Sequence, residues 1–328
     1  MKMEQSLEKR LKAWQRAVKN RLQNPALPGE PPYLINPMNY ALDHQGKMLR
    51  SALCLASAEA VGGKWEVALD IASAIEIFHT FTLVHDDIMD GDELRRGVET
   101  VHKKYGTDRA LLAGDTLLIY VYQIIARSSP DKLSVVLEAF NSGAMDVCLG
   151  QGWDMEFEAK RNVSPQQYEM MIDHKTGALV RLSCKLGGII AGGSDRQVSA
   201  LSRFGLLLGR AFQMQDDLLE MSSTVAEMGK SLGSDLLNEK KTWIWLDLKK
   251  NLSPEESQRW ESIRRSGSLA NDDRQRLHHW MEKYGTIERA EALIASWIAE
   301  AGDILQGSDF VQTEMLAALS NLILTRKK

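Results

Sequence analysis

The chain has 328 residues, of which 44% are hydrophobic and 26% charged, a composition typical of a globular protein with ample material for a core. Its formal net charge is -4, and its basic residues form no long run, which argues against nucleic acid as a partner. The N-terminal segment MKMEQSLEKRLKAW mixes charged and apolar positions and lacks the apolar core of a signal peptide. No stretch approaches the roughly 18 to 20 uninterrupted apolar residues of a spanning helix, so we expect no membrane span.

The three cysteines, Cys54, Cys148 and Cys184, are odd in number, far apart in the sequence and without CxxC spacing. This pattern disfavours a disulfide framework or a zinc site. It predicts buried thiols in a protein of the reducing cytoplasm.

Prolines divide the chain unevenly. Five of the eight lie between residues 25 and 37, which predicts an N-terminal helix followed by a Pro-rich, extended connector within residues 1–40. Only Pro130, Pro165 and Pro254 follow, so most of the chain is free to form long helices.

Helix starts are marked at three places. Residues 164–167 and 253–256 each combine a capping Ser, a Pro at the first helical position and a Gln or Glu two residues later. Residues 194–197 repeat the Ser and Gln and open a helix that is expected to run to about residue 221.

Apolar residues recur at helical spacing, for example over residues 69–78 and 201–212, and no series of alternating strands is present. The sequence therefore predicts an all-α protein with a single domain over residues 1–328. The polar stretch 251–275 is expected to form a surface excursion.

Two carboxylate pairs carry the chemistry. Asp86 and Asp90, and likewise Asp216 and Glu220, are four residues apart near the ends of long apolar helices, so each pair shares a helix face. Like charges at this spacing repel, whereas a hard cation such as Mg²⁺ reverses the sign of the interaction. A single pair could be a solvated acidic helix end, but the apolar residues before Asp86 and the second pair favour a metal site.

A metal held by carboxylates suggests a polyphosphate substrate, and the chain offers matching cations. They are Lys47, Arg50, Arg95, Arg96, Lys175, Lys230 and Lys240. Each alone is compatible with an ordinary surface charge, and Arg95 and Arg96 are also compatible with local balance of the five acids before them. The P-loop pattern GxxxxGK[ST] is missing, which disfavours a nucleotide triphosphatase.

In chain order, the sequence contains the blocks GKMLR, FHTFTLVHDDIMD, ELRRG, HKTGAL, FQMQDD, GKSLGSDL and KKTW, between residue 46 and about residue 243. These blocks resemble the polyprenyl synthetase family of trans-isoprenyl diphosphate synthases. The resemblance implies a bundle of about ten core helices around a central cavity, which usually assembles as a homodimer. It also implies Mg²⁺-dependent head-to-tail condensation of isopentenyl diphosphate with an allylic diphosphate, without a protein nucleophile.

The resemblance also implies roles for individual residues, matched by position. A group of about three Mg²⁺ ions, bound with the allylic diphosphate, would be held by Asp86, Asp90 and Asp216. The same diphosphate would be held by Arg95, Lys175, Lys230 and Lys240. Isopentenyl diphosphate would be held by Lys47, Arg50, His79 and Arg96. The developing allylic cation would face Thr176 and Gln213.

Two departures from the family pattern stand out. The second acidic motif ends in Glu220 instead of Asp, which puts direct metal ligation at that position in doubt. The common GGK–RP pattern reads Gln45-Gly46-Lys47 and Arg50-Ser51, which leaves the charged groups intact.

Two alternatives remain open. A class I terpene cyclase shares the acidic motifs, but it lacks the isopentenyl site that the GKMLR and RRG blocks indicate. A non-catalytic subunit of a heteromeric synthase typically loses the Asp motifs, which this chain retains.

Product length is expected to depend on Phe81, five residues before Asp86 and therefore about 7.5 Å along the helix axis. In the family, an aromatic residue here resembles short-chain synthases, although Phe81 could instead be a plain core residue. The expected product is geranylgeranyl diphosphate, with farnesyl diphosphate next.

Overall fold

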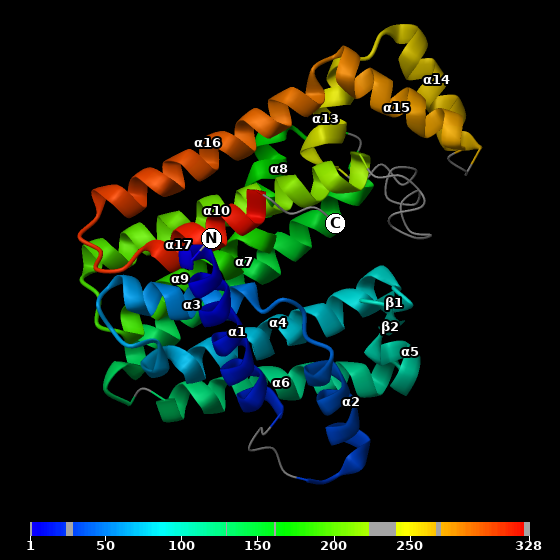
Figure 1. The fold of residues 1–328 in the computed structure, drawn as a ribbon. Coiled ribbons are helices and arrows are strands. Elements are labelled where there is room, and N and C mark those ends of the chain that lie inside the picture. The colour runs from blue at the N-terminus through cyan, green and yellow to red at the C-terminus, as the bar shows by residue number, and fades with distance from the viewer. Residues whose placement is uncertain are drawn as a thin grey trace. The chain divides into compact units, whose positions relative to one another are not determined.

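The computed structural model describes residues 2–23, 29–128, 130–160, 162–222, 241–266 and 270–324 (Figure 1). Helices dominate these residues, and their one sheet is a short antiparallel hairpin of β1 (Leu94–Arg95) and β2 (Val98–Glu99). The prediction of an all-α protein is confirmed. Contacts divide the chain into two compact units, which are described one at a time.

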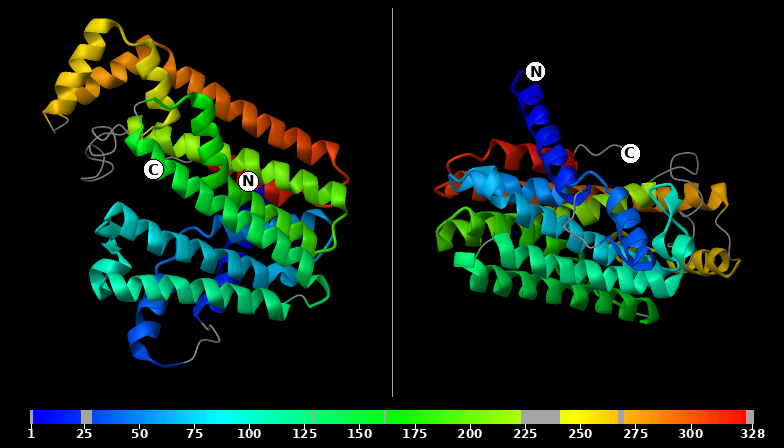
Figure 2. Two further views of the ribbon diagram at one scale, coloured as in Figure 1. Left: turned by 180° about the vertical axis from the view of Figure 1, so that it is seen from behind. Right: turned by 90° about the horizontal axis from the view of Figure 1, so that it is seen from below.

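The first unit comprises residues 1–142, 179–202 and 305–319. Its complete elements are α1 (Lys2–Gln23), α2 (Pro32–Asp43), α3 (Leu49–Ala60), η1 (Trp65–Ala68), α4 (Leu69–Asp90), the hairpin, α5 (Val101–Tyr105), α6 (Thr107–Ser128) and η2 (Pro130–Lys132). It also includes the first part of α7 (Leu133–Ala159), most of α9 (Ala178–Ile190) and the start of α10 (Asp195–Ser222). The helix α4 packs lengthwise along α6 and also contacts α3 and α1 (Figures 1 and 2).

The helix α4 forms the centre of this unit because it is apolar around most of its circumference. Its buried side chains include Ile71, Ile75, Ile77, Phe78 and Val84. Burial of aliphatic and aromatic side chains of this size contributes about 1.5 to 3 kcal/mol each. The first acidic motif therefore stands at the end of a firmly packed helix, as the sequence predicts.

The Pro-rich connector is shorter than predicted. The first helix, α1, is present, but the chain is helical again from Pro32, and Pro37 lies inside α2. Proline is tolerated in the first turn of a helix because the N–H groups there have no intrahelical partner. Residues 32–40 are thus helix and not extended chain.

The second unit comprises residues 143–178, 203–304 and 320–328, as far as they are described. It contains the rest of α7, α8 (Pro165–Ile172), the π-helical turn η3 (Asp173–Gly177) and most of α10. Four further helices follow: α13 (Trp243–Asn251), α14 (Pro254–Arg265), α15 (Asn271–Lys283) and most of α16 (Thr286–Gly307). The last helix, α17 (Glu314–Leu324), is shared between the units.

The predicted helix starts are confirmed. Ser164 and Ser253 form capping boxes with Gln167 and Glu256, and the Ser194 side chain accepts from the Gln197 backbone N–H where α10 begins. Within the stretch 251–275, α14 buries Trp260 to 2% exposure, and its ring lies 4.7 Å from that of Trp245 between centroids. Trp260 therefore anchors this part of the stretch in the apolar core, although most residues of the stretch are polar.

The prediction for the cysteines is right for two of three. Cys54 and Cys184 are buried, and burial raises the pKa of both thiols, so they stay protonated. Cys148 is exposed, because it lies on the same outward face of α7 as Met145 and Leu149.

Three helical stretches have the length and composition of a membrane span: residues 65–90, 107–128 and 130–159. Of the apolar window in the first of them, 61% is buried inside the protein. Much of the apolar surface of α4 is therefore already used in packing, and these helices do not establish a span.

Candidate active site

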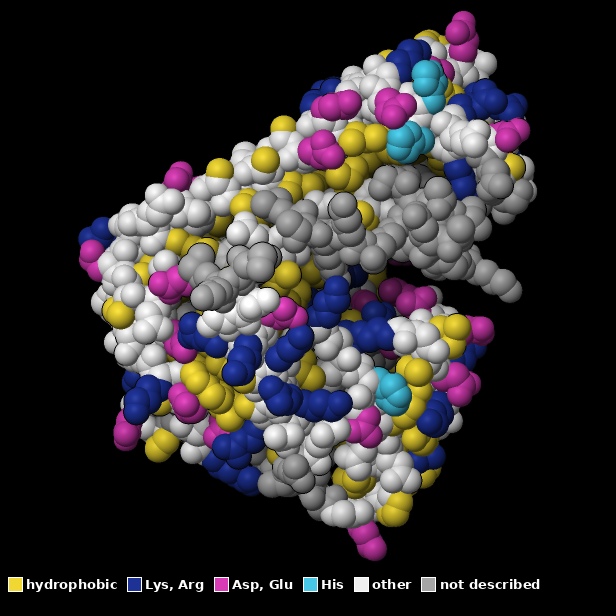
Figure 3. Space-filling model, in the orientation of Figure 1, with side chains coloured by type: hydrophobic (Ala, Val, Ile, Leu, Met, Phe, Trp, Pro, Cys, Tyr) yellow, Lys and Arg dark blue, Asp and Glu magenta, His cyan; other side chains and the backbone are white. Residues whose placement is uncertain are grey.

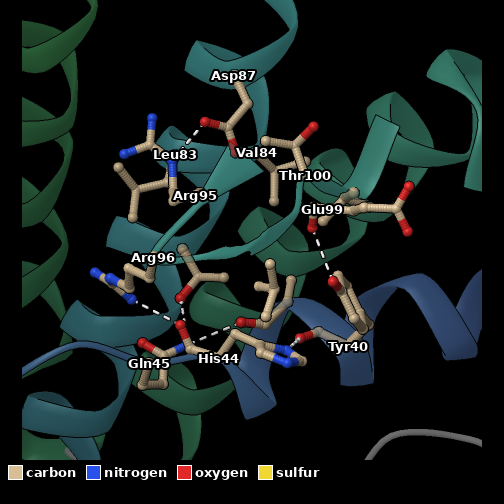
Figure 4. A pocket seen from close by; sticks show the side chains of 14 residues that line it. Tyr40, His44, Gln45, Leu83, Val84, Asp87, Arg95, Arg96, Glu99 and Thr100 are labelled. Carbon is tan, nitrogen blue, oxygen red and sulfur yellow. Dashed lines mark hydrogen bonds and ion pairs between the residues drawn. The ribbon is translucent and has the colours of Figure 1, made fainter. Parts of the chain in front are cut away.

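The last turn of α4 presents the first acidic pair. Gly91 takes the left-handed conformation with φ 69°, and its N–H bonds the Asp87 carbonyl, so the helix ends directly after Asp90. The Asp86 side chain is 21% exposed, whereas that of Asp87 is only 5% exposed and accepts a hydrogen bond from Arg95 Nε (Figure 4). Burial raises the pKa of Asp87, and the nearby Arg95 opposes this shift. The adjacent acids Asp86 and Asp87 thus have different environments: Asp87 is buried and hydrogen-bonded to Arg95, whereas Asp86 is more exposed and lies 3.9 Å from Arg95 Nη2.

The β1–β2 hairpin brings two arginines next to these acids. Arg96 and Gly97 form its two-residue turn, with φ of 55° and 81°, which is the pattern of a type I′ turn. Among the described residues, Arg96 and Met48 are the two non-glycine residues with positive φ. Such backbone outliers cluster at functional sites. Arg96 is itself one of the predicted phosphate-binding residues, and Met48 follows another, Lys47.

Arg96 lies against the segment that precedes α3. Its Nη1 donates to the His44 carbonyl oxygen at 2.7 Å, and a Cβ at Gly46 would come within 2.7 Å of its Nη2. The two arginines line a small cavity of about 50 Å³ together with Gln45, Thr80 and Asp87, among others (Figure 4). Burial lowers the pKa of Arg96. The structure thus places Arg96 of the RRG block against the GKMLR block, two blocks that the family resemblance assigns to the same substrate.

Arg50 and His79 form a direct pair, with 3.1 Å between Nη1 and Nε2. Burial and the guanidinium groups of Arg50 and Arg96 hold the pKa of His79 well below its usual range, so the imidazole is neutral. Because an arginine can only donate, His79 accepts at Nε2 and carries its proton on Nδ1. The pair offers several donors and one positive charge, a set that suits a phosphate group.

Lys47 is exposed and lines a different hollow of about 710 Å³ next to α1. Three further cations in its wall, Lys12, Arg16 and Lys19, come from α1, and the Gln15 side chain donates to the Lys47 carbonyl oxygen at 2.7 Å. Lys and Arg side chains gather visibly over α1 in the space-filling view (Figure 3). The surface around Lys47 is therefore attractive to anions.

On α10, the adjacent acids Asp216 and Asp217 also differ in burial. Asp217 is 5% exposed and accepts hydrogen bonds from the Tyr168 hydroxyl and from Gln213 Nε2, the latter at 2.9 Å. Burial, together with the charge of Asp217, raises the pKa of Tyr168 well above its usual range. Asp216, next to it, is only half-buried.

Gln213 in turn orients Thr176. The Thr176 hydroxyl donates to Gln213 Oε1 at 2.6 Å, while Gln213 Nε2 is occupied by Asp217. With its hydrogen committed, the Thr176 oxygen can offer lone pairs to a nearby cation. These two residues are therefore brought together as predicted.

The π-helical turn η3, which carries Lys175 and Thr176, is fixed on several sides. Arg210 donates to both carboxylate oxygens of Asp173 at 2.6 Å, and Lys175 Nζ donates to Asp154 Oδ2. A Cβ at Gly150 would come within 2.1 Å of the Lys175 backbone nitrogen, so α7 and the turn meet backbone to backbone. Single π-helical turns are frequent at functional sites.

Phe81 is half-buried in a short aromatic series. Its ring centroid lies 5.6 Å from that of Phe78 and 4.8 Å from that of His85, and Phe78 in turn contacts Phe140 at 5.1 Å. Phe81 thus has aromatic neighbours and also an exposed part.

Some predicted positions lie outside the described residues. These are Lys230, Lys240 and the side chain of Glu220. Conversely, sequence reasoning missed Asp154 and Tyr168 and gave no separate role to Asp87 and Asp217. Asp154 is one of several acids in α7, and neither it nor Tyr168 is marked by a motif in the sequence.

The donor chemistry fits a hard metal ion. Asp86 and Asp90 supply only oxygen donors, and no group of three or more His, Cys, Asp or Glu side chains is gathered at one point in the described part of the chain. Mg²⁺ is typically held by one or two carboxylates and completes its shell with water and substrate phosphate. The residues present fit such an ion.

The end of α4 places the acids of the first motif beside Arg95 on an all-α scaffold, so carboxylates for a metal ion and a guanidinium group for an anionic substrate lie together, as in enzymes that act on phosphate esters. The comparisons specify the family. A model of the polyprenyl synthetase family matches residues 31–281. The chain belongs to this family and is a prenyltransferase.

Individual proteins to which the chain is similar are also isoprenyl diphosphate synthases. The chain is 35% identical over 303 residues to a short chain isoprenyl diphosphate synthase of Methanothermobacter thermautotrophicus, covering 90% of this chain and 91% of that one. It is 36% identical over 253 residues to a geranylfarnesyl diphosphate synthase of Natronomonas pharaonis, covering 71% and 74%. The crystal structure of geranylgeranyl pyrophosphate synthetase from Pyrococcus horikoshii is similar with a TM-score of 0.90 and 34% identity, over 98% of this chain and 99% of that one.

Proposed function

We propose that the protein condenses isopentenyl diphosphate with an allylic diphosphate, head to tail, to give a short all-trans prenyl diphosphate. The observation that carries the proposal lies within the first unit. Asp86 and Asp90 lie in the last turn of α4, where Asp87 accepts a hydrogen bond from Arg95. On the same helix, the neutral His79 pairs with Arg50 of α3. Carboxylates for metal and guanidinium groups for phosphate therefore occur together.

In this proposal, Asp86, Asp90 and Asp216 hold Mg²⁺, a group of about three ions with the allylic substrate. When bound, the metal supplies positive charge that stabilises the departing diphosphate. Arg95 and Lys175, with Lys230 and Lys240, add fixed positive charge to the same leaving group. Thr176 and Gln213 direct oxygen lone pairs at the allylic cation as it forms.

Isopentenyl diphosphate is assigned to Arg50, His79 and Arg96, with Lys47 at the edge. Since His79 is neutral, it contributes one N–H donor without adding charge, and Arg50 and Arg96 provide planar donor pairs for phosphate oxygens. The presence of this second set of donors favours a synthase over a class I terpene cyclase. The retained acids favour a catalytic subunit over an inactive one.

We further propose a cytoplasmic homodimer without a membrane span and without a nucleic-acid partner. The outward faces of α6 and α7 support the dimer, because they carry several exposed apolar residues: Leu112, Ile119, Tyr122, Val135, Met145 and Leu149. The product is proposed to be geranylgeranyl diphosphate, with farnesyl diphosphate as the second candidate. The names of the relatives, which include geranylgeranyl and geranylfarnesyl diphosphate synthases, favour a short chain.

Metal removal tests the proposal. We expect EDTA to abolish condensation, and Mg²⁺ or Mn²⁺ added in excess to restore it, because the carboxylate donors prefer hard cations. Product formation is measured with radiolabelled isopentenyl diphosphate, and the chelator is removed by gel filtration before metal is added. Full turnover in metal-free buffer would contradict the proposal.

A further inference from the structure

One buried acid has no part in the proposed reaction. Glu76 lies on α4, one turn before His79, and is only 3% exposed. A carboxylate this deep in a protein needs donors, because desolvation penalises its charge. Its Oε1 accepts a hydrogen bond from the backbone N–H of Ser51 at 2.9 Å, and its charge also attracts Arg96.

Ser51 lies in the first turn of α3, where a backbone N–H needs an acceptor from outside the helix. The helix α3 begins at Leu49, so the Ser51 N–H belongs to the first turn and has no intrahelical acceptor. The residue before the helix, Met48, has no oxygen in its side chain and makes no side-chain cap. Glu76 thus caps α3 from another helix, and its negative charge also suits the positive end of the helix dipole.

Glu76 is the deepest of three links from α4 to the same short segment. Gln45 Nε2 donates to Thr80 Oγ1 at 2.9 Å, and Arg50 bonds His79 at 3.1 Å. Thr80, His79 and Glu76 occupy neighbouring positions on one face of α4. Residues 45–51, which carry both Lys47 and Arg50, are therefore attached to α4 along their length.

We infer that Glu76 is a positioning residue for isopentenyl diphosphate: by capping α3 at Ser51 it fixes Arg50 against His79, without contacting substrate itself. Only the expected effect on the KM for isopentenyl diphosphate rests on the proposed function. The local consequence, a firmly held first turn of α3, is independent of which reaction the protein catalyses. Loss of the hydrogen bond to Ser51 and loss of the negative charge of Glu76 would have different effects, and these can be measured separately.

Two conservative variants separate these possibilities. Glu76→Gln keeps an oxygen at the same reach and removes the charge, whereas Glu76→Asp keeps the charge and withdraws it by one methylene. We expect Glu76→Asp to raise the KM for isopentenyl diphosphate about tenfold, since a hydrogen bond to a charged group is at stake, and to leave the KM for the allylic substrate within about twofold. Glu76→Gln should raise the first KM less than about threefold.

Amide hydrogen exchange gives a second measurement that does not depend on activity. In Glu76→Asp, exchange at the Ser51 amide should speed up by at least about tenfold, while exchange in the middle of α4 should not change. The matched control is Glu59→Gln, at the other end of α3, where the acid is paired with Arg10 and its side chain is 12% exposed. This variant should leave both the Ser51 exchange and the KM for isopentenyl diphosphate as they are.

The outcomes separate this inference from the proposed function. If the wild-type protein forms no product with isopentenyl diphosphate, the proposed function fails, and exchange at Ser51 still tests the cap. If the wild type is active but Glu76→Asp changes neither exchange nor KM, the inference is overturned. An increase in KM for Glu76→Gln that equals or exceeds the increase for Glu76→Asp would overturn it too, because loss of the Ser51 hydrogen bond would then not explain the effect.

Discussion

Replacing Asp86 with Ala is expected to lower kcat by about a thousandfold or more, roughly 4 kcal/mol of transition-state stabilisation. Asp86 is more exposed than the adjacent Asp87, which is buried and hydrogen-bonded to Arg95, so the metal loses a carboxylate that Asp87 cannot replace. The loss should appear in kcat more than in KM, because positive charge around the leaving group is needed most as the C–O bond breaks. Steady-state kinetics at saturating Mg²⁺ measure it.

Asp70→Ala is the matched control. Asp70 is an acid in the first turn of the same helix, and it forms an exposed pair with Arg21 at 3.2 Å. Surface pairs contribute about 0 to 1 kcal/mol, so this variant should keep its activity and lose little stability. An Asp86→Ala enzyme with a kcat close to that of the control would contradict the metal role of the first motif.

Replacing Phe81 with Ala should lengthen the product. The side chain lies about 7.5 Å along α4 from Asp86, and it is half-buried between Phe78 and His85. Removing the ring leaves apolar space into which a growing tail can extend, so a wild type that stops at 20 carbons should give a variant with products of 25 carbons or more. Mass spectrometry of the dephosphorylated products measures the distribution, and the rate of the first condensation should fall little.

Phe310→Ala provides the comparison, because Phe310 is also half-buried but lies outside α4 and just before α17. It should leave the chain length as in the wild type. If Phe81→Ala also left the length unchanged, Phe81 would be a plain packing residue, and the 20-carbon prediction would lose its physical support.

Much of the fold could be predicted from the sequence because its signals are local. The capping boxes at Ser164 and Ser253 lie within three residues of their partners, and the helical nature of α4 and α10 follows from their apolar spacing. Where local rules allow two outcomes, prediction was less accurate. Proline at residue 32 suits both a connector and a helix start, and tertiary packing selected the helix.

The charged residues of the candidate site could be named from the sequence, but their burial and their hydrogen-bond partners could not. Nothing local shows that Asp217 binds Tyr168, because these residues are 49 positions apart and meet only through packing. The same holds for Lys175 with Asp154 and for Glu76 with Ser51, which are 21 and 25 positions apart. Motif spacing predicts which acids share a helix face, whereas the burial of Asp87 and Asp217 and the donors that bond them follow only from the fold.

The most direct measurement of the central claim is product formation by the purified chain alone, with Mg²⁺ and each allylic diphosphate, with and without isopentenyl diphosphate. We expect longer prenyl diphosphates, up to about 20 carbons, only when isopentenyl diphosphate is present, because the donors around Arg50 and His79 are assigned to that substrate. A cyclised hydrocarbon formed from the allylic substrate alone, or no product from the purified chain under either condition, would contradict it.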